Sequence, residues 1–142
     1  VPYLDCAPHG KHARVPGESV PLWALVYHDC VLGWRRAPAL QPERFRLRCL
    51  ENVLWGWALV FGGFTAADWP EQREAFAESL YVDEWHARIG TDEMVDHCYL
   101  TDDFLVEQTE WSSGPAVAVN FSDEDRTVDG VQVPARGYVV RD

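Results

Sequence analysis

The chain has little positive charge and no long apolar run. Twelve basic side chains stand against twenty-three acidic ones, which gives a net charge of −11 over 142 residues. That charge repels phosphate backbones and anionic lipid surfaces, and it argues against nucleic acid as a partner. No apolar stretch approaches the roughly 18 to 20 residues that a membrane span needs. We therefore expect no membrane partner and a cytoplasmic location, with a processed, secreted fragment as the alternative.

The cysteines and histidines lack the spacing of a metal site. Cys6, Cys30, Cys49 and Cys98 are widely separated, no C-x-x-C pair occurs, and no histidine lies at a zinc-ligand spacing from them. We therefore expect no metal and no other cofactor. Two disulfides are conceivable. Reduced thiols are the favoured interpretation, because Cys30 and Cys49 lie in apolar surroundings where a buried thiol is common.

Methionine is nearly absent, since Met94 is the only one, and Val1 is therefore not an initiator residue. The start of the chain does not have the layout of a signal peptide. With 47% hydrophobic residues the chain is able to form one or two small units, burying about two-thirds of its unfolded surface. We expect it to be a piece of a longer protein.

The segment Pro21–Asp29 carries the clearest functional signal. Its apolar residues run without alternation and then change abruptly to Tyr27, His28 and Asp29. Such a run is typical of a strand buried on both faces of a parallel sheet. Ligands bind beyond the carboxyl ends of these strands, so we predict the three residues as a site, with two side chains facing one accessible concavity. The alternative is a solvated turn that simply ends the strand.

Two helices are expected next. Pro42 suits the first turn of a helix that would end at Gly62-Gly63. Asp68 is suited to the N-cap of a second helix, with Pro70 just inside it and Gly90 at its end. The buried stripe of this second helix is expected at Ala75, Phe76, Leu80 and Ile89.

From Glu93 onward the hydrophobic period is close to two, which predicts an antiparallel β unit. Asp129-Gly130 predicts a hairpin with a type I′ turn, and Trp111 is expected to pack, or else to serve as a sugar platform. The strands are expected at residues 95–100, 105–110, 116–121, 127–133 and 138–140, with inward side chains at Val95, Leu105, Val117, Val119, Phe121 and Val139.

Three stretches resemble parts of a known enzyme family. These are VPLWALVYHD, RCLENVLWGWALVFGG and the tail HCYLTDDFLVEQTEWSSGPAVAVNFSDEDRTVDGVQVPARGYVV. The first two resemble the last strand and helix of the barrel in glycoside hydrolase family 129 and its relatives around family 101, and the tail resembles the β-sandwich that follows such barrels. The resemblance covers most of residues 20–142.

The resemblance implies an α/β part followed by an all-β part. Residues 1–91 would form the terminal β/α unit of a TIM-type barrel, and residues 92–142 a small antiparallel β-sandwich. A complete barrel needs about 200 to 250 residues, so most of it would lie outside this chain. The catalytic carboxylates of such enzymes come from earlier strands, and no catalytic residue is assigned here.

The family's enzymes act on α-linked N-acetylgalactosamine, which implies a carbohydrate substrate. Sugar sites combine an aromatic platform with a few fixed polar groups. Tyr27, His28 and Asp29 would supply the polar groups, and Trp34 the platform. We expect a C-terminal segment of a glycosidase, inactive alone, whose partners are the sugar and the rest of the parent barrel. The alternative is a non-catalytic carbohydrate-binding or interaction module.

Overall fold

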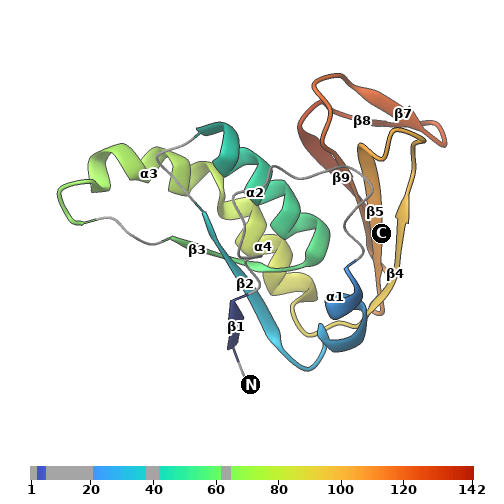
Figure 1. The fold of residues 1–142 in the computed structure, drawn as a ribbon, viewed down its shortest axis with the longest axis horizontal. Coiled ribbons are helices and arrows are strands. Elements are labelled where there is room, and N and C mark those ends of the chain that lie inside the picture. Colours follow the sequence, from blue (N-terminus) through green and yellow to red (C-terminus); the bar gives the residue numbers. More distant parts are fainter. Residues whose placement is uncertain (1–2, 6–20, 38–41, 62–64) are drawn as a thin grey trace.

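The computed structural model describes residues 3–5, 21–37, 42–61 and 65–142. A parallel sheet and an antiparallel sheet lie on either side of a central helix (Figure 1). The parallel sheet has the strand order β1-β2-β3, and a helix follows each of its strands in the chain. Its strands are β1 (Tyr3–Asp5), β2 (Leu32–Ala37) and β3 (Ala58–Phe61), and the helices are α1 (Leu22–Tyr27), α2 (Pro42–Trp55), α3 (Trp69–Glu78) and α4 (Leu80–Ile89).

The antiparallel region agrees closely with the sequence prediction. The main sheet has the order β4-β5-β6-β9, and β7 and β8 pair separately as a hairpin. Asp129 and Gly130 have φ values of 50° and 79°, which confirms a turn with two left-handed residues. The strands are β4 (Met94–Tyr99), β5 (Val106–Trp111), β6 (Ala116–Asn120), β7 (Arg126–Val128), β8 (Val131–Val133) and β9 (Gly137–Arg141).

The prediction of a strand at Pro21–Asp29 is wrong, because residues Leu22–Tyr27 form the helix α1. Pro21, Ala24 and His28 are buried, and this spacing of three and four residues is helical. Leu22 is 67% exposed and Val26 is 53% exposed, so the apolar run is not buried on all sides. The central strand of the parallel sheet is instead β2, which follows α1 in the chain.

Helix α2 begins at Pro42 as predicted but ends at Trp55, before the expected Gly62-Gly63, which lies outside the described residues. Gly56 has a φ of 67° and caps the helix. The Gly56 N–H donates to Val53 O and the Trp57 N–H donates to Asn52 O, which is the pair of bonds in a Schellman motif. The chain then continues directly into β3.

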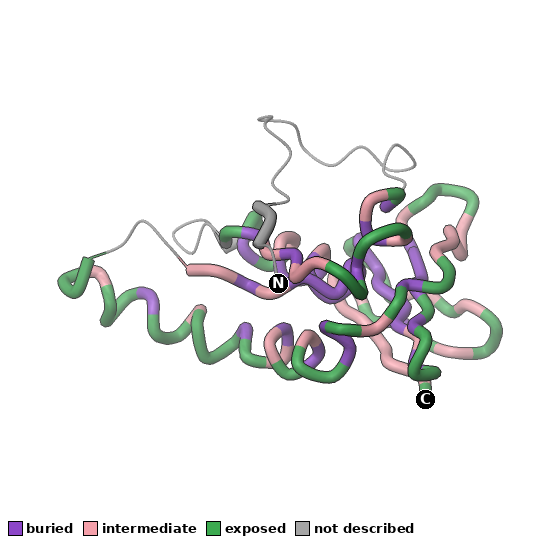
Figure 2. Tube along the Cα trace, turned by 90° about the horizontal axis from the view of Figure 1, so that it is seen from below, coloured by how far each residue is buried: buried purple, intermediate pink, exposed green. Residues whose placement is uncertain are grey.

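The second predicted helix is divided into α3 and α4 at Ser79, whose hydroxyl donates to Phe76 O. Asp68 and Gly90 are the N-cap and C-cap residues as predicted. Ile89 is buried, but Phe76 and Leu80 are exposed. Figure 2 shows that α3, at the left of the molecule, is largely exposed along its length, whereas α4 is buried on one side.

A single large hydrophobic cluster joins the helices to the antiparallel sheet. It contains Val53 and Leu54 of α2, Ile89 of α4, and Trp111 and Val119 of the sheet. Trp111 is only 2% exposed, which confirms the expected packing role. Val95 is 51% exposed, and Met94 is buried in its place. The register shift between Met94 and Asp96 explains this error, because a bulge reverses the alternation on which the prediction rested.

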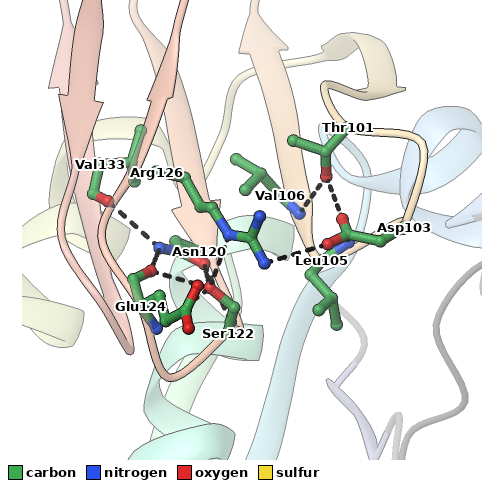
Figure 3. Close-up of polar contacts among 9 residues, drawn as sticks. All are labelled: Thr101, Asp103, Leu105, Val106, Asn120, Ser122, Glu124, Arg126 and Val133. Atoms are coloured by element: carbon green, nitrogen blue, oxygen red, sulfur yellow. Dashed lines mark hydrogen bonds and ion pairs between the residues drawn. The ribbon is translucent and has the colours of Figure 1, made fainter.

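One end of the antiparallel sheet is fixed by a polar network (Figure 3). The buried Asn120 amide donates to the carbonyl oxygens of Glu124 and Val133. Arg126 donates to the Ser122 hydroxyl at 3.3 Å and forms an ion pair with Asp103 at 3.2 Å. These contacts hold the β7–β8 hairpin against the ends of β5 and β6.

The fold is therefore mixed α/β with a β-rich C-terminal region, as the sequence predicted. Within the described residues the parallel sheet has three strands, and the main antiparallel sheet packs on α2. In the part of the chain that the structure covers, no helix is both long and apolar enough to cross a bilayer.

Candidate functional site

The two faces of the parallel sheet differ in what they contact. Arg35 faces α2, since its guanidinium donates to Glu51 at 2.6 Å and lies 4.9 Å from the ring centres of both Trp55 and Trp57. Side chains alternate along a strand, so Trp34 and Arg36 project from the opposite face. We call this opposite surface the open face of the sheet.

The open face carries an aromatic ring and a guanidinium two residues apart. Trp34 is half-buried and Arg36 is exposed. In the sheet register, Trp34 lies opposite Asp5 of β1 and Ala58 of β3, while Arg36 lies opposite Val60. A ring next to the small apolar Ala58 offers a stacking surface, and a guanidinium offers several donors in a fixed plane. Sequence analysis found Trp34 but missed Arg36.

Arg35 was also missed, and it determines where Trp34 and Arg36 lie. It is 3% exposed, and its charge is compensated by Glu51, which also accepts from Arg48 at 2.6 Å. Two indole rings around the guanidinium add cation–π attraction. The buried ion pair fixes β2 on α2. An unpaired charge at this depth would be strongly destabilising, so a shift of β2 by one residue, which would turn Arg35 away from Glu51, is disfavoured.

The predicted triplet lies at the other end of β2. Tyr27 ends α1, and His28 and Asp29 precede the first residue of the strand, whereas Arg36 lies near its carboxyl end. Tyr27 and Asp29 are exposed, but His28 is 2% exposed. The structure therefore does not bring the three side chains together at the carboxyl end of a strand, and it separates them from Arg36 along β2.

His28 holds three segments together. Its Nδ1 lies 2.7 Å from Asp92 O, its Nε2 lies 3.1 Å from Gly56 O, and its ring packs on Trp111 at 4.5 Å. Burial lowers the pKa of His28 below its ordinary value, although the two carbonyl contacts oppose that effect. The neutral ring can donate to only one of the two oxygens. His28 thus joins α1 to the end of α2 and to the α4–β4 turn.

Among the described residues, the cysteines give no sign of nucleophilic chemistry. Cys30, Cys49 and Cys98 are free thiols. The Asp29 carboxylate beside Cys30 raises the pKa of that thiol, and burial raises the pKa of Cys49 to about 12. Both effects oppose the thiolate form, which is the reactive one. Within the described ranges, no group of three or more histidine, cysteine, aspartate or glutamate side chains is arranged to hold a metal ion.

No protein-family model matches the chain, and no curated protein matches it. Solved structures of the α-N-acetylgalactosaminidase NagBb from Bifidobacterium bifidum do match. The structure with GalNAc matches 99% of this chain at 23% identity, with a TM-score of 0.60 and 20% of that chain covered. The ligand-free structure matches 81% of this chain at 27% identity, with a TM-score of 0.54 and 17% of that chain covered.

A quadruple mutant of the same enzyme matches 73% of this chain at 27% identity, with a TM-score of 0.58. These structural neighbours are glycoside hydrolases. They support the link to glycoside hydrolase family 129 that the sequence resemblance indicated. The chain spans only 16 to 20% of the length of the solved enzyme chains.

Proposed function

We propose that this chain is the C-terminal segment of a glycosidase that acts on α-linked N-acetylgalactosamine. The observation that carries the proposal is the match of 99% of the chain to an α-N-acetylgalactosaminidase at a TM-score of 0.60. In this proposal residues 1–91 complete a (β/α) barrel contributed mainly by the rest of the parent protein. Residues 92–142 form the β domain that packs against the outer helices.

The open face would line the inside of the barrel. In a barrel one face of every strand points inward and the other contacts the surrounding helices. Because α2 covers the Arg35 side of β2, the inward side would carry Trp34 and Arg36. Trp34 would stack on the apolar face of the sugar, and Arg36 would donate to its hydroxyl or acetamide oxygens.

Tyr27, His28 and Asp29 have a different place in this proposal. Tyr27 and Asp29 remain proposed sugar contacts because both are exposed. They would act from the amino-terminal side of β2, or on a part of the substrate distant from the bond that is cleaved. His28, which is buried against Trp111, would support them by fixing the end of α1.

Hydrolysis by the chain alone is not expected. Glycosidases of the two-carboxylate type need an acid and a second carboxylate flanking the bond. On β2 and β3 the open face offers a ring and a guanidinium, and neither can protonate the leaving group at neutral pH. Asp5 of β1, in register with Trp34, would supply at most one of the two carboxylates. The chain would therefore contribute binding and positioning, and the rest of the parent protein would contribute the chemistry.

The test is hydrolysis of an aryl α-N-acetylgalactosaminide by the protein made from the complete reading frame. We expect activity, and we expect Trp34→Ala to lower kcat/KM by roughly 10- to 100-fold. Trp69→Ala is the matched control, since Trp69 is an exposed tryptophan on α3. Binding of the sugar without hydrolysis by the complete protein would instead establish the non-catalytic module. If the complete protein neither binds nor hydrolyses the sugar, the glycosidase and the non-catalytic module are both contradicted.

A further inference from the structure

A groove of about 920 Å³ lies on the side of the molecule formed by α2, α3, α4 and β9. Helices α2 and α3 form its long walls. Tyr81 of α4 and Tyr138 of β9 also line it, together with Pro134 and Arg136 from the connection between β8 and β9 and Gly137 at the start of β9. The groove does not include Trp34 or Arg36, so it is separate from the open face.

The two tyrosines give the groove an aromatic surface. Their ring centres are 5.2 Å apart and their planes differ by 22°, so the rings are stacked. Both residues are half-buried, and the Tyr81 hydroxyl is hydrogen-bonded to the buried Cys49 thiol. Burial raises the pKa of both phenols, so both keep their proton at neutral pH. The pair joins α4 to β9 and is held in place from beneath by α2.

The polar lining combines acceptors and donors. Glu71, Glu74 and Glu78 recur along α3 at spacings of three and four residues, which places them on one stripe of the helix. Arg46 faces them from α2. At the β-rich end, Arg136 forms an ion pair with Asp123 at 2.7 Å. With Glu43, five carboxylates and two guanidiniums line the groove, a formal charge of −3.

This combination distinguishes between classes of ligand. The carboxylates alone do not define the site. A plain polycation such as a lysine-rich peptide would be attracted by them but repelled by Arg46 and Arg136. Sugar hydroxyls can donate to carboxylates and accept from guanidiniums, and a sugar ring has an apolar face for an aromatic surface. The excess of carboxylates then favours a sugar with positive charge, which is an amino sugar with a free ammonium group.

We propose that this groove is a second carbohydrate-binding site, which takes an oligosaccharide with free amino groups. The sugar rings lie against Tyr138 and Leu47, the half-buried apolar residue of α2 in the groove lining, and the ammonium groups face Glu74 and Glu78. The site is independent of hydrolysis at the open face. It serves to hold a charged, partly deacetylated glycan on the outer side of the molecule.

The test is calorimetric titration of the chain at low salt with three probes. These are a fully deacetylated glucosamine trisaccharide, the same trisaccharide in N-acetylated form, and tetralysine. We expect the deacetylated sugar to bind at least about tenfold more tightly than the acetylated sugar, and tetralysine not to saturate. Equal binding of tetralysine would show a purely electrostatic surface, and equal binding of the acetylated sugar would remove the role of charge. Either result, or no binding of any probe, overturns the proposal.

Two single substitutions test whether the sugar binds in this groove. Glu74→Gln removes one charge from an exposed helix position without changing its shape, and we expect it to weaken the deacetylated sugar about three- to tenfold. Glu124→Gln is the matched control, since Glu124 is exposed and lies outside the groove lining, and it should leave binding unchanged. Equal weakening by both variants would contradict the site. Glu74→Gln should not affect hydrolysis by the complete protein, which separates this test from that of the proposed function.

Discussion

Gly56 is the residue on which most of the local packing depends. It takes a φ of 67° at the end of α2, and its carbonyl oxygen lies against two histidine rings, His28 and His86. A Cβ atom at this position would lie 2.5 Å from His28, from Ile89 and from Trp111. Backbone conformation and available space therefore both require glycine.

We expect Gly56→Ala to lower the free energy of unfolding by about 2 to 4 kcal/mol, because it adds core overpacking to left-handed strain. Urea denaturation measures the loss. Gly130→Ala is the matched control, since Gly130 also has a positive φ of 79° but nothing lies within 4 Å of an added Cβ. Gly130→Ala should lower the free energy of unfolding by only about 1 kcal/mol. If both substitutions lower the free energy of unfolding equally, the close contacts around Gly56 do not contribute to stability.

His28 should make stability depend on pH. Its pKa is lowered in the folded chain mainly by burial, so the unfolded chain binds a proton more readily. The free energy of unfolding should therefore be highest above the ordinary histidine pKa of 6.5 and fall as the pH drops below it. Denaturation at a series of pH values measures the slope. His28→Gln should reduce it, and an unchanged slope would exclude His28 as the source.

At the scale of elements, α2 is the centre of the molecule. It packs on β2 and β3 of the parallel sheet and on β5 and β6 of the antiparallel sheet. The Thr109 hydroxyl of β5 donates to Leu54 O at 2.8 Å and so provides a partner for a carbonyl near the end of the helix. The two sheets are thus connected mainly through α2 and not by direct strand pairing, and α4 adds a second connection through its contacts with β3 and, at Tyr81, with Tyr138 of β9.

Thr109→Val should lower the free energy of unfolding by about 1 to 2 kcal/mol, because it leaves a buried carbonyl without its partner at nearly constant volume. Thr127→Val is the control, because Thr127 is exposed on β7 and the same change there should stay within about 0.5 kcal/mol. Thermal or urea unfolding compares the two variants. A loss at residue 127 as large as at residue 109 would contradict the role of the α2–β5 hydrogen bond.

At the scale of the whole molecule, the proposed units 1–91 and 92–142 share one core. The same hydrophobic cluster contains Val53, Leu54 and Ile89 from the first unit and Trp111 and Val119 from the second. Separating the units would expose this cluster to water on both sides. The two units therefore depend on each other for burial of their apolar surface.

We expect the chain to unfold in a single cooperative transition, with both units losing structure together. Far-UV circular dichroism follows the helices and strands, and near-UV circular dichroism follows the packed tryptophans Trp85 and Trp111. The two signals should change at the same urea concentration. Separate midpoints would show that the units fold independently in spite of the common core.

The sequence alone determined the C-terminal strands, the start of α3, the end of α4 and the start of α2. Alternation, turn residues and caps are local signals, and each acts within a few residues of the position it decides. The Asp129-Gly130 turn is the clearest instance, because both residues take the positive φ that its turn type demands. The resemblance to glycosidases also rested on the sequence, and structural neighbours support it.

Only the tertiary structure decided the positions of α1, β2 and β3. An unbroken apolar run has no period, so Pro21–Asp29 could not be assigned to helix or strand until the contacts of Ala24 and His28 with distant segments were known. Arg35 is buried because Glu51 and two tryptophans of a later segment surround it. Those partners are brought near only by folding, which is why a segment with adjacent arginines became a central strand and placed Trp34 and Arg36 on the open face.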